Sequence, residues 1–104
     1  MGLNNMPLSK EIRILEVLAQ HPQGLTKLEA IQHGDTCINT TISKLQSKHR
    51  LAFDRTTDLI HDRFGGKTKF VRYRLSGEQR ELALSIVKRE RDKVRTEAVS
   101  KKTL

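Results

Sequence analysis

Two short amphipathic segments joined by a tight polar turn occupy residues 25–51, and they restrict the possible folds more than any other stretch. The first segment begins with Thr26, and Glu29 follows three residues later. This capping-box spacing predicts a helix start, because each side chain can bind a backbone N–H group of the first turn. The segment ends at Gly34, where glycine adopts a positive φ without strain. Its apolar residues are expected to share a face: Leu28 and Ile31, with Ala30 beside them.

The second segment begins within residues 35–37, where Asp35 and Thr36 are plausible N-caps and Cys37 is not. Its apolar residues follow at i, i+4 and i+7 and are expected to point inward: Ile38, Ile42 and Leu45. Two such helices separated by a short turn form the pattern of a helix-turn-helix.

The outer face of this second helix carries amides, hydroxyls and lysines: Asn39, Thr40, Ser43, Lys44, Ser47 and Lys48. No acidic residue lies within residues 39–48, so the face suits the electronegative major groove of DNA. An ordinary solvated helix face is the competing interpretation. Its position as the second helix of a helix-turn-helix pair favours the first interpretation.

A first helix is predicted from Ser9, or from Asn5 with Pro7 in its first turn, to about Gln20. Its inward face is broad and consists of Ile12, Leu15, Leu18 and Ala19, widened by Ile14 and Val17. Residues 21–24 end this helix, and residues 24–26 are expected to pair briefly with a later hairpin as a first short strand.

Residues 51–75 are predicted to form a two-stranded hairpin. Alternation along the strand from Phe53 is imperfect, and a bulge near residues 59–60 would reconcile it. Residues 65–66 are both glycine, which fits a two-residue primed turn because such a turn needs positive φ. The return strand alternates cleanly, so we expect Val71, Tyr73 and Leu75 to face the core and Arg72 and Arg74 to face solvent.

The hairpin tip carries three cations, Arg63, Lys67 and Lys69, around the two glycines. A flexible, positively charged tip is suited to a phosphate or minor-groove contact. An exposed sheet edge kept soluble by lysines explains the same pattern equally well.

A long C-terminal helix is predicted from a second capping box at Ser76 to about Thr96. Its apolar side comprises Leu82, Ala83, Ile86, Val87 and Val94, and Leu84 lies well off this side. This arc is wider than one intramolecular contact needs, which suggests a homodimer through this helix. Residues 1–8 and the basic residues 97–104 are expected to be flexible tails.

The charge of the chain is concentrated in its second half. Residues 1–46 contain four basic and four acidic residues, so the whole net charge of +8 lies on residues 47–104. This asymmetry favours a polyanionic partner for the hairpin and the last helix. An anionic membrane surface would also fit, but no strongly amphipathic, aromatic-bearing segment supports it.

Several function classes find no support in the sequence. The four histidines fall in different predicted elements, and no spacing of Cys and His suits a metal. No nucleophile set, carboxylate pair or glycine-rich cofactor loop is present. No apolar run approaches membrane-spanning length and no secretory segment is recognised. Together with the single Cys37, this predicts a cytoplasmic protein that is not an enzyme and holds no cofactor or metal.

The order of these elements resembles the small winged helix-turn-helix domains found in phage and prophage proteins. The matching residues are Leu25-Thr26, Leu28-Glu29-Ala30, Gly34, Ile42, Leu45 and Tyr73-Arg74-Leu75. The resemblance covers about residues 12–75 and rests mostly on core positions. Two departures concern the recognition helix: Thr41 stands where those domains often place an arginine, and His49-Arg50 replaces the usual glycine after the helix.

We therefore expect an α+β, mostly helical winged helix-turn-helix protein with a three-helix core, a two-stranded wing and a long C-terminal helix; residues 9–76 form the domain. The resemblance implies sequence-specific binding of double-stranded DNA by a transcriptional or excision regulator. The residues expected to bind DNA are Asn39, Thr40, Thr41, Ser43, Lys44, Ser47, Lys48, Arg63, Lys67 and Lys69. The alternative is a protein-interaction module that uses the same fold to dock on a host or phage protein.

Overall fold

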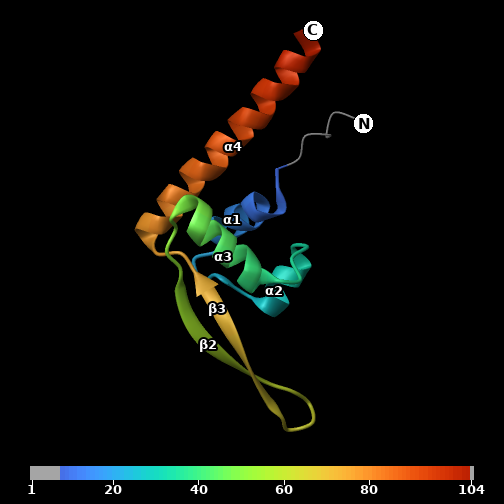
Figure 1. The fold of residues 1–104 in the computed structure, drawn as a ribbon. Coiled ribbons are helices and arrows are strands. Elements are labelled where there is room, and N and C mark those ends of the chain that lie inside the picture. Colours follow the sequence, from blue (N-terminus) through green and yellow to red (C-terminus); the bar gives the residue numbers. More distant parts are fainter. Residues whose placement is uncertain (1–7, 104) are drawn as a thin grey trace.

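The structure, a computed structural model, describes residues 8–103 and the side chains up to residue 94. Within this part the fold is α+β, with four helices and one three-stranded antiparallel sheet (Figure 1). The elements in chain order are α1 Lys10–Gln20, β1 Leu25–Thr26, α2 Lys27–Gln32, α3 Ile38–His49, β2 Asp54–His61, β3 Lys67–Arg74 and α4 Gly77–Thr103. Most of the expected N-terminal tail, residues 1–7, lies outside the described residues.

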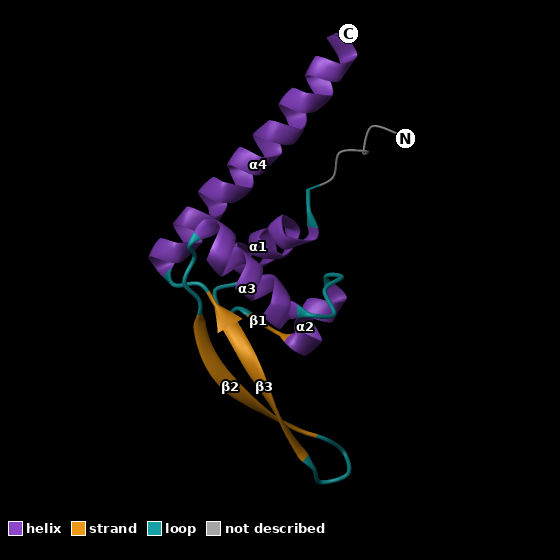
Figure 2. Cartoon of the chain, in the orientation of Figure 1, coloured by secondary structure: helices purple, strands orange, loops and turns teal. Residues whose placement is uncertain are grey.

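Helices α1, α2 and α3 form the centre of the molecule, and two long elements leave it in opposite directions (Figure 2). Helix α4 packs its first turns on α1 and then extends away from the body, while the β2–β3 hairpin projects from the other end. The longest dimension is 62 Å as a result. The hairpin is therefore held only at its base.

The predicted helix starts are confirmed for α1 and α2. The Ser9 hydroxyl accepts a hydrogen bond from the Ile12 N–H at 3.3 Å. At α2 the capping box is complete: the Thr26 hydroxyl accepts from the Glu29 N–H, and the Glu29 carboxylate accepts from the Thr26 N–H at 3.0 Å. These bonds satisfy backbone donors that the first helical turn would otherwise leave free.

The expected short strand β1 is also present. It directly precedes α2 in the chain and pairs with β3, which gives the sheet order β1-β3-β2. Gly24 just before it has φ +78°, and a Cβ atom there would collide with the carbonyl of Tyr73. Glycine is therefore needed both for its backbone conformation and for the close approach of β3.

The core is built from the apolar faces that the sequence predicts for α1 and α3. The fully buried side chains include Ile14, Leu15, Leu18, Ile42 and Leu45, and helix α4 adds Ala83, Ile86 and Val87. Leu8, expected in a flexible tail, packs against this core instead. The expectation for α2 is only partly met, because Ala30 is buried while Leu28 and Ile31 remain exposed.

The turn between α2 and α3 is organised by the completely buried carboxylate of Asp35. Its oxygens accept hydrogen bonds from the Cys37 N–H at 2.9 Å and from the Thr41 hydroxyl at 2.6 Å. The predicted cap was wrong in position: the N-cap residue of α3 is Cys37, whose side chain makes no capping bond. Asp35 lies two residues earlier and stabilises the turn instead of capping the start of the helix.

The hairpin differs from its prediction in two places. Strands β2 and β3 pair in one unbroken register from Asp54↔Arg74 to His61↔Lys67, so the expected bulge near residues 59–60 is absent. The connection is a five-residue loop, residues 62–66, and not a two-residue turn. Gly65 has the expected positive φ, but the loop is closed mainly by the Asp62 carboxylate, which accepts from the N–H groups of Phe64 and Gly66.

Two predicted orientations on β3 were wrong. Val71 is 42% exposed because the hairpin extends beyond the core, so only Tyr73 and Leu75 are buried at its base. Arg72 was expected in solvent, but its side chain is only 18% exposed. Its guanidinium donates to Glu29 of α2 at 2.9 and 3.1 Å, to Asp58 of β2 at 2.7 and 2.9 Å, and to the Gly24 carbonyl.

The Arg72 ion cluster, which we define as Arg72, Glu29 and Asp58, changes the acidity of its members. Burial of Glu29 works to raise its pKa, but the hydrogen bonds from Arg72 and from the Thr26 N–H outweigh it and lower the pKa. The hydrogen bond from Arg72 also lowers the pKa of Asp58. The two carboxylates, Asp58 first, raise the pKa of Arg72.

Helix α4 continues beyond its predicted end near Thr96 to Thr103, so most of the expected tail 97–104 is helical and Leu104 lies outside the described residues. The sequence from residue 78 to residue 103 contains no glycine or proline and is rich in Glu, Lys and Arg, which favour helix. Leu82 and Leu84 remain exposed on its first half.

The Asp35→Ala variant is expected to lose about 2–3 kcal/mol of unfolding free energy, because the Cys37 N–H and the buried Thr41 hydroxyl lose their acceptor. Urea denaturation followed by circular dichroism measures this loss. The matched control is Thr36→Ala, an exposed residue of the same turn, which should change stability by less than about 0.5 kcal/mol. Equal losses in the two variants would contradict the role of the buried carboxylate.

The stability of the protein is expected to fall in acid through the Arg72 ion cluster. Glu29 and Asp58 have lower pKa values in the folded state than their ordinary values of 4.5 and 3.8, so the unfolded chain binds more protons in acid. Their contribution is complete above about pH 4.5 and is lost as the pH falls through the folded-state pKa values.

Arg72→Met should lower the unfolding free energy by about 1–2 kcal/mol at neutral pH and flatten this acid-side loss. Arg74→Met is the control, because Arg74 and its partner Asp54 are about half exposed and their ion pair contributes little. A pH profile of Arg72→Met that parallels the unchanged protein would refute the assignment.

Candidate nucleic-acid interface

The outward face of α3 consists of six exposed polar residues, all of them predicted: Asn39, Thr40, Ser43, Lys44, Ser47 and Lys48. Thr41, which was also expected to bind DNA, is 1% exposed and donates its hydroxyl proton to Asp35. It cannot reach a ligand from this position, because it lies on the side of the helix that covers the turn. The prediction for Thr41 is therefore corrected to a structural role.

A carboxylate from another element borders this face. Glu11 of α1 accepts from the Lys44 ammonium at 3.5 Å, so one of the two lysines of the face is partly neutralised. The pKa of Glu11 is lowered, mainly by a hydrogen bond from its own backbone N–H and also by the nearby Lys44 and Lys48. Burial opposes this effect without cancelling it. Sequence reasoning missed this contact because the two residues lie 33 positions apart.

Arg55 of β2 joins the other edge of α3 to the sheet. Its guanidinium donates to the Gln46 side chain of α3 at 2.8 Å and lies 5.3 Å from the ring centre of Tyr73, a cation–π distance. These contacts hold a cation beside the polar face of α3. Arg55 was not among the predicted site residues, because its place beside α3 depends on the path of the chain between them.

The two faces of the hairpin differ in charge. Residues at alternate positions share a face, and paired residues on the two strands point the same way. The basic face comprises Arg55, Thr57, Leu59 and His61 of β2 with Lys67, Lys69, Val71 and Tyr73 of β3. It carries three cations and no carboxylate.

The opposite face, which we call the paired face, holds Asp54 and Asp58 with Arg72 and Arg74. Each carboxylate forms an ion pair with one of the arginines: Asp58 with Arg72 at 2.7 Å and Asp54 with Arg74 at 3.3 Å. The charges of this face are therefore neutralised within the protein. The unpaired positive charge of the hairpin strands lies on the side that adjoins α3.

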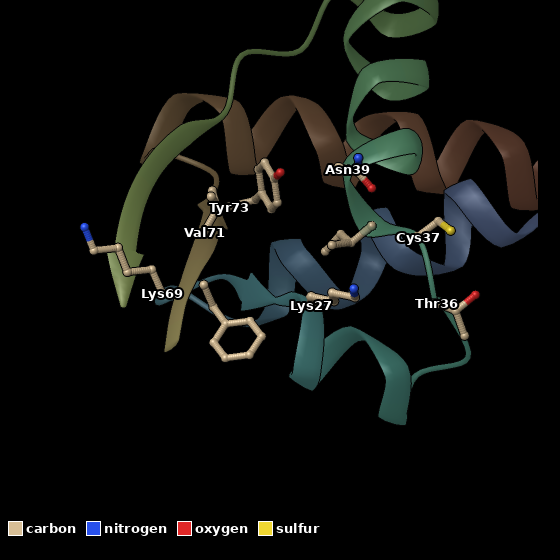
Figure 3. Close-up of a pocket in the computed structure, with 9 residues that line it drawn as sticks. Lys27, Thr36, Cys37, Asn39, Lys69, Val71 and Tyr73 are labelled. Carbon is tan, nitrogen blue, oxygen red and sulfur yellow. The ribbon is translucent and has the colours of Figure 1, made fainter. Parts of the chain in front are cut away.

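A groove of about 410 Å³ separates the beginning of α3 from β3. Figure 3 shows Thr36, Cys37 and Asn39 on one side of it and Lys69, Val71 and Tyr73 on the other. Lys27, the first residue of α2, lies below them and adds a second lysine. Two predicted residues, Asn39 and Lys69, thus line the same groove from two different elements.

The remaining predicted cations, Arg63 and Lys67, lie at the hairpin tip, away from the helices (Figure 1). The tip is better ordered than the two glycines suggested. Besides the two bonds to its carboxylate, Asp62 donates its N–H to the Gly66 carbonyl at 2.9 Å and accepts from the Gly65 N–H at 3.3 Å. Arg63 is therefore carried on a closed loop, and Lys67 follows this loop at the start of β3.

The described residues contain neither a metal-ligand cluster nor a membrane-spanning helix. No group of three or more His, Cys, Asp and Glu side chains there is placed to hold a metal ion, although the rings of His21 and His33 lie 5.9 Å apart. Within residues 8–103 the structure contains no helix that is both long and apolar enough to span a lipid bilayer. The polar face of α3 and the basic face of the hairpin are the candidate interface.

No protein-family model, no curated protein and no solved structure matches the chain.

Proposed function

We propose that this protein is a cytoplasmic winged helix-turn-helix regulator that binds double-stranded DNA. Helix α3 is the recognition helix of this proposal and the β2–β3 hairpin is its wing. The polar side chains of α3 contact base edges in the major groove, while the hairpin cations bind the phosphate backbone and the adjacent minor groove.

The observation that carries the proposal is the division of charge on the hairpin. The basic face beside α3 carries Arg55, Lys67 and Lys69. Both carboxylates of the strands instead form ion pairs with arginines on the paired face. Solubility alone does not require the unpaired cations to lie on one face of the hairpin and the ion pairs on the other. A polyanion that lies along α3 would meet cations and hydroxyls, with Glu11 as the bordering carboxylate.

Docking on another protein is the second candidate. It is favoured by the apolar side chains exposed on the basic face, Leu59 at 48% and Val71 at 42%, and by the absence of arginine from α3. Such a partner would need an acidic rim to match Lys67 and Lys69.

Fluorescence anisotropy with random and genomic-library duplexes distinguishes the two candidates. Four cations are assigned to the backbone: Lys48, Arg63, Lys67 and Lys69. Their phosphate contacts predict that log affinity falls with log salt at a slope of about −3.6. Absence of binding at low salt would reject the proposal and direct attention to a protein partner.

Lys69→Ala is expected to weaken binding to every duplex by about fivefold at physiological salt and to reduce the salt slope by about 0.9. The matched control is Arg74→Ala, which removes the same charge from the same strand on the paired face and should change affinity less than about twofold. Equal weakening in both variants would show that net charge, and not the basic face, determines binding.

Thr40→Ala and Ser43→Ala are expected to change which sequences are preferred, since these exposed hydroxyls face outward from α3. Loss of one base contact should alter discrimination at that position by about 1–3 kcal/mol while leaving the salt slope unchanged. Selection from a random duplex library, followed by sequencing, measures the preference. An unaltered preference in both variants would remove α3 from the base-reading role.

A further inference from the structure

Phe64, at the tip of the hairpin, is the most exposed of the large apolar side chains in the described part of the chain. Its side chain is 89% exposed, whereas the next, Leu59, is 48% exposed. The described residues contribute no core near the tip, because the loop of residues 62–66 lies at the far end of the hairpin (Figure 2). The ring therefore lies in solvent, free to contact a partner outside the chain.

The loop presents this ring on an ordered backbone. One oxygen of the Asp62 carboxylate accepts from the Phe64 N–H at 2.7 Å and from the Gly66 N–H at 2.9 Å. Gly66 leaves room for that carboxylate, since a Cβ atom there would press on it. The negative charge of Asp62 is thus directed to the backbone of the loop.

Cations flank Phe64 in the sequence. Arg63 precedes Phe64 and Lys67 follows the loop, and both are exposed. A rigid apolar side chain between two cations is the combination that minor-groove proteins use, in which an apolar wedge enters between base pairs and phosphates are bound beside it.

The length of the hairpin suits this position. Tyr73 lies beside α3, and six further residues of β3 reach Lys67 at the tip, which corresponds to about 20 Å at the rise of an extended strand. Half a turn of duplex DNA, the offset between the major groove and the next minor groove, is about 17 Å. With α3 in the major groove, the hairpin is therefore long enough to span the distance to the adjoining minor groove.

We propose that Phe64 inserts between base pairs from the minor groove and that the protein thereby unstacks a base step and bends the duplex. This inference rests on the proposed DNA binding and adds a deforming activity to it. The wedge opens the step on its minor-groove side, and the duplex bends toward the major groove. Flexible pyrimidine–purine steps are the expected targets, because they unstack at the lowest cost.

Phe64→Trp tests the insertion directly, since the chain contains no other tryptophan. Addition of a duplex should quench the indole fluorescence by stacking and shield it from acrylamide. The control is Ile60→Trp, near the tip on the paired face, whose fluorescence and acrylamide access should change little. Anisotropy of the labelled duplex, recorded in the same titration, reports binding independently of insertion.

Phe64→Ala should abolish the bend, measured by energy transfer between dyes at the two ends of the duplex. Its affinity should fall by about five- to tenfold, as expected for loss of one base–aromatic contact, with an unchanged salt slope because no charge is removed. Binding by the unchanged protein without a bend, together with an accessible indole in Phe64→Trp, would overturn the insertion and leave DNA binding intact.

Absence of any anisotropy change would overturn the insertion and the proposed function together. Shielding of the indole without DNA, dependent on protein concentration, would instead assign Phe64 to contact with a second copy and would also overturn the insertion.

Discussion

The side chain of Arg72 is the point at which the separate parts of this small fold are joined. It contacts Glu29 at the start of α2, Asp58 on β2 and the Gly24 carbonyl before β1, while its own backbone belongs to β3. Glu29 also caps α2, so one carboxylate serves both the helix start and the hairpin base. Because the hairpin extends beyond the core, this cluster is one of the contacts that hold its base to the body.

The same cluster has a consequence for charge. With Asp58 and Asp54 engaged on the paired face, the basic face keeps Arg55, Lys67 and Lys69 free of carboxylate partners on the strands. Stabilisation of the hairpin base and exposure of positive charge beside α3 are therefore two results of one arrangement. Loss of Arg72 in particular would leave Asp58 without its partner and alter both the stability and the field of the hairpin.

The position of α3 depends in a similar way on a buried polar contact. Asp35 binds both the backbone before the helix and the Thr41 hydroxyl within it, so the turn and the first turns of the helix are held by one side chain. The adjoining residues of the outward face, such as Thr40 and Ser43, carry no part of this contact and remain available. An α-helix has 3.6 residues per turn, so the buried Thr41 and the exposed Thr40 and Ser43 lie on different faces of α3.

The sequence by itself determined the helices, their inward faces and the location of the hairpin, because caps and apolar spacing act locally: Ser9, Thr26 and Ile42 have the roles predicted for them. The roles of Arg72 and Thr41 were decided only by the tertiary structure. Each depends on a carboxylate from another element or turn, and the distance between such groups is set by chain folding. Local patterns do not contain that distance, so an arginine on an alternating strand and a threonine on a polar helix both looked exposed.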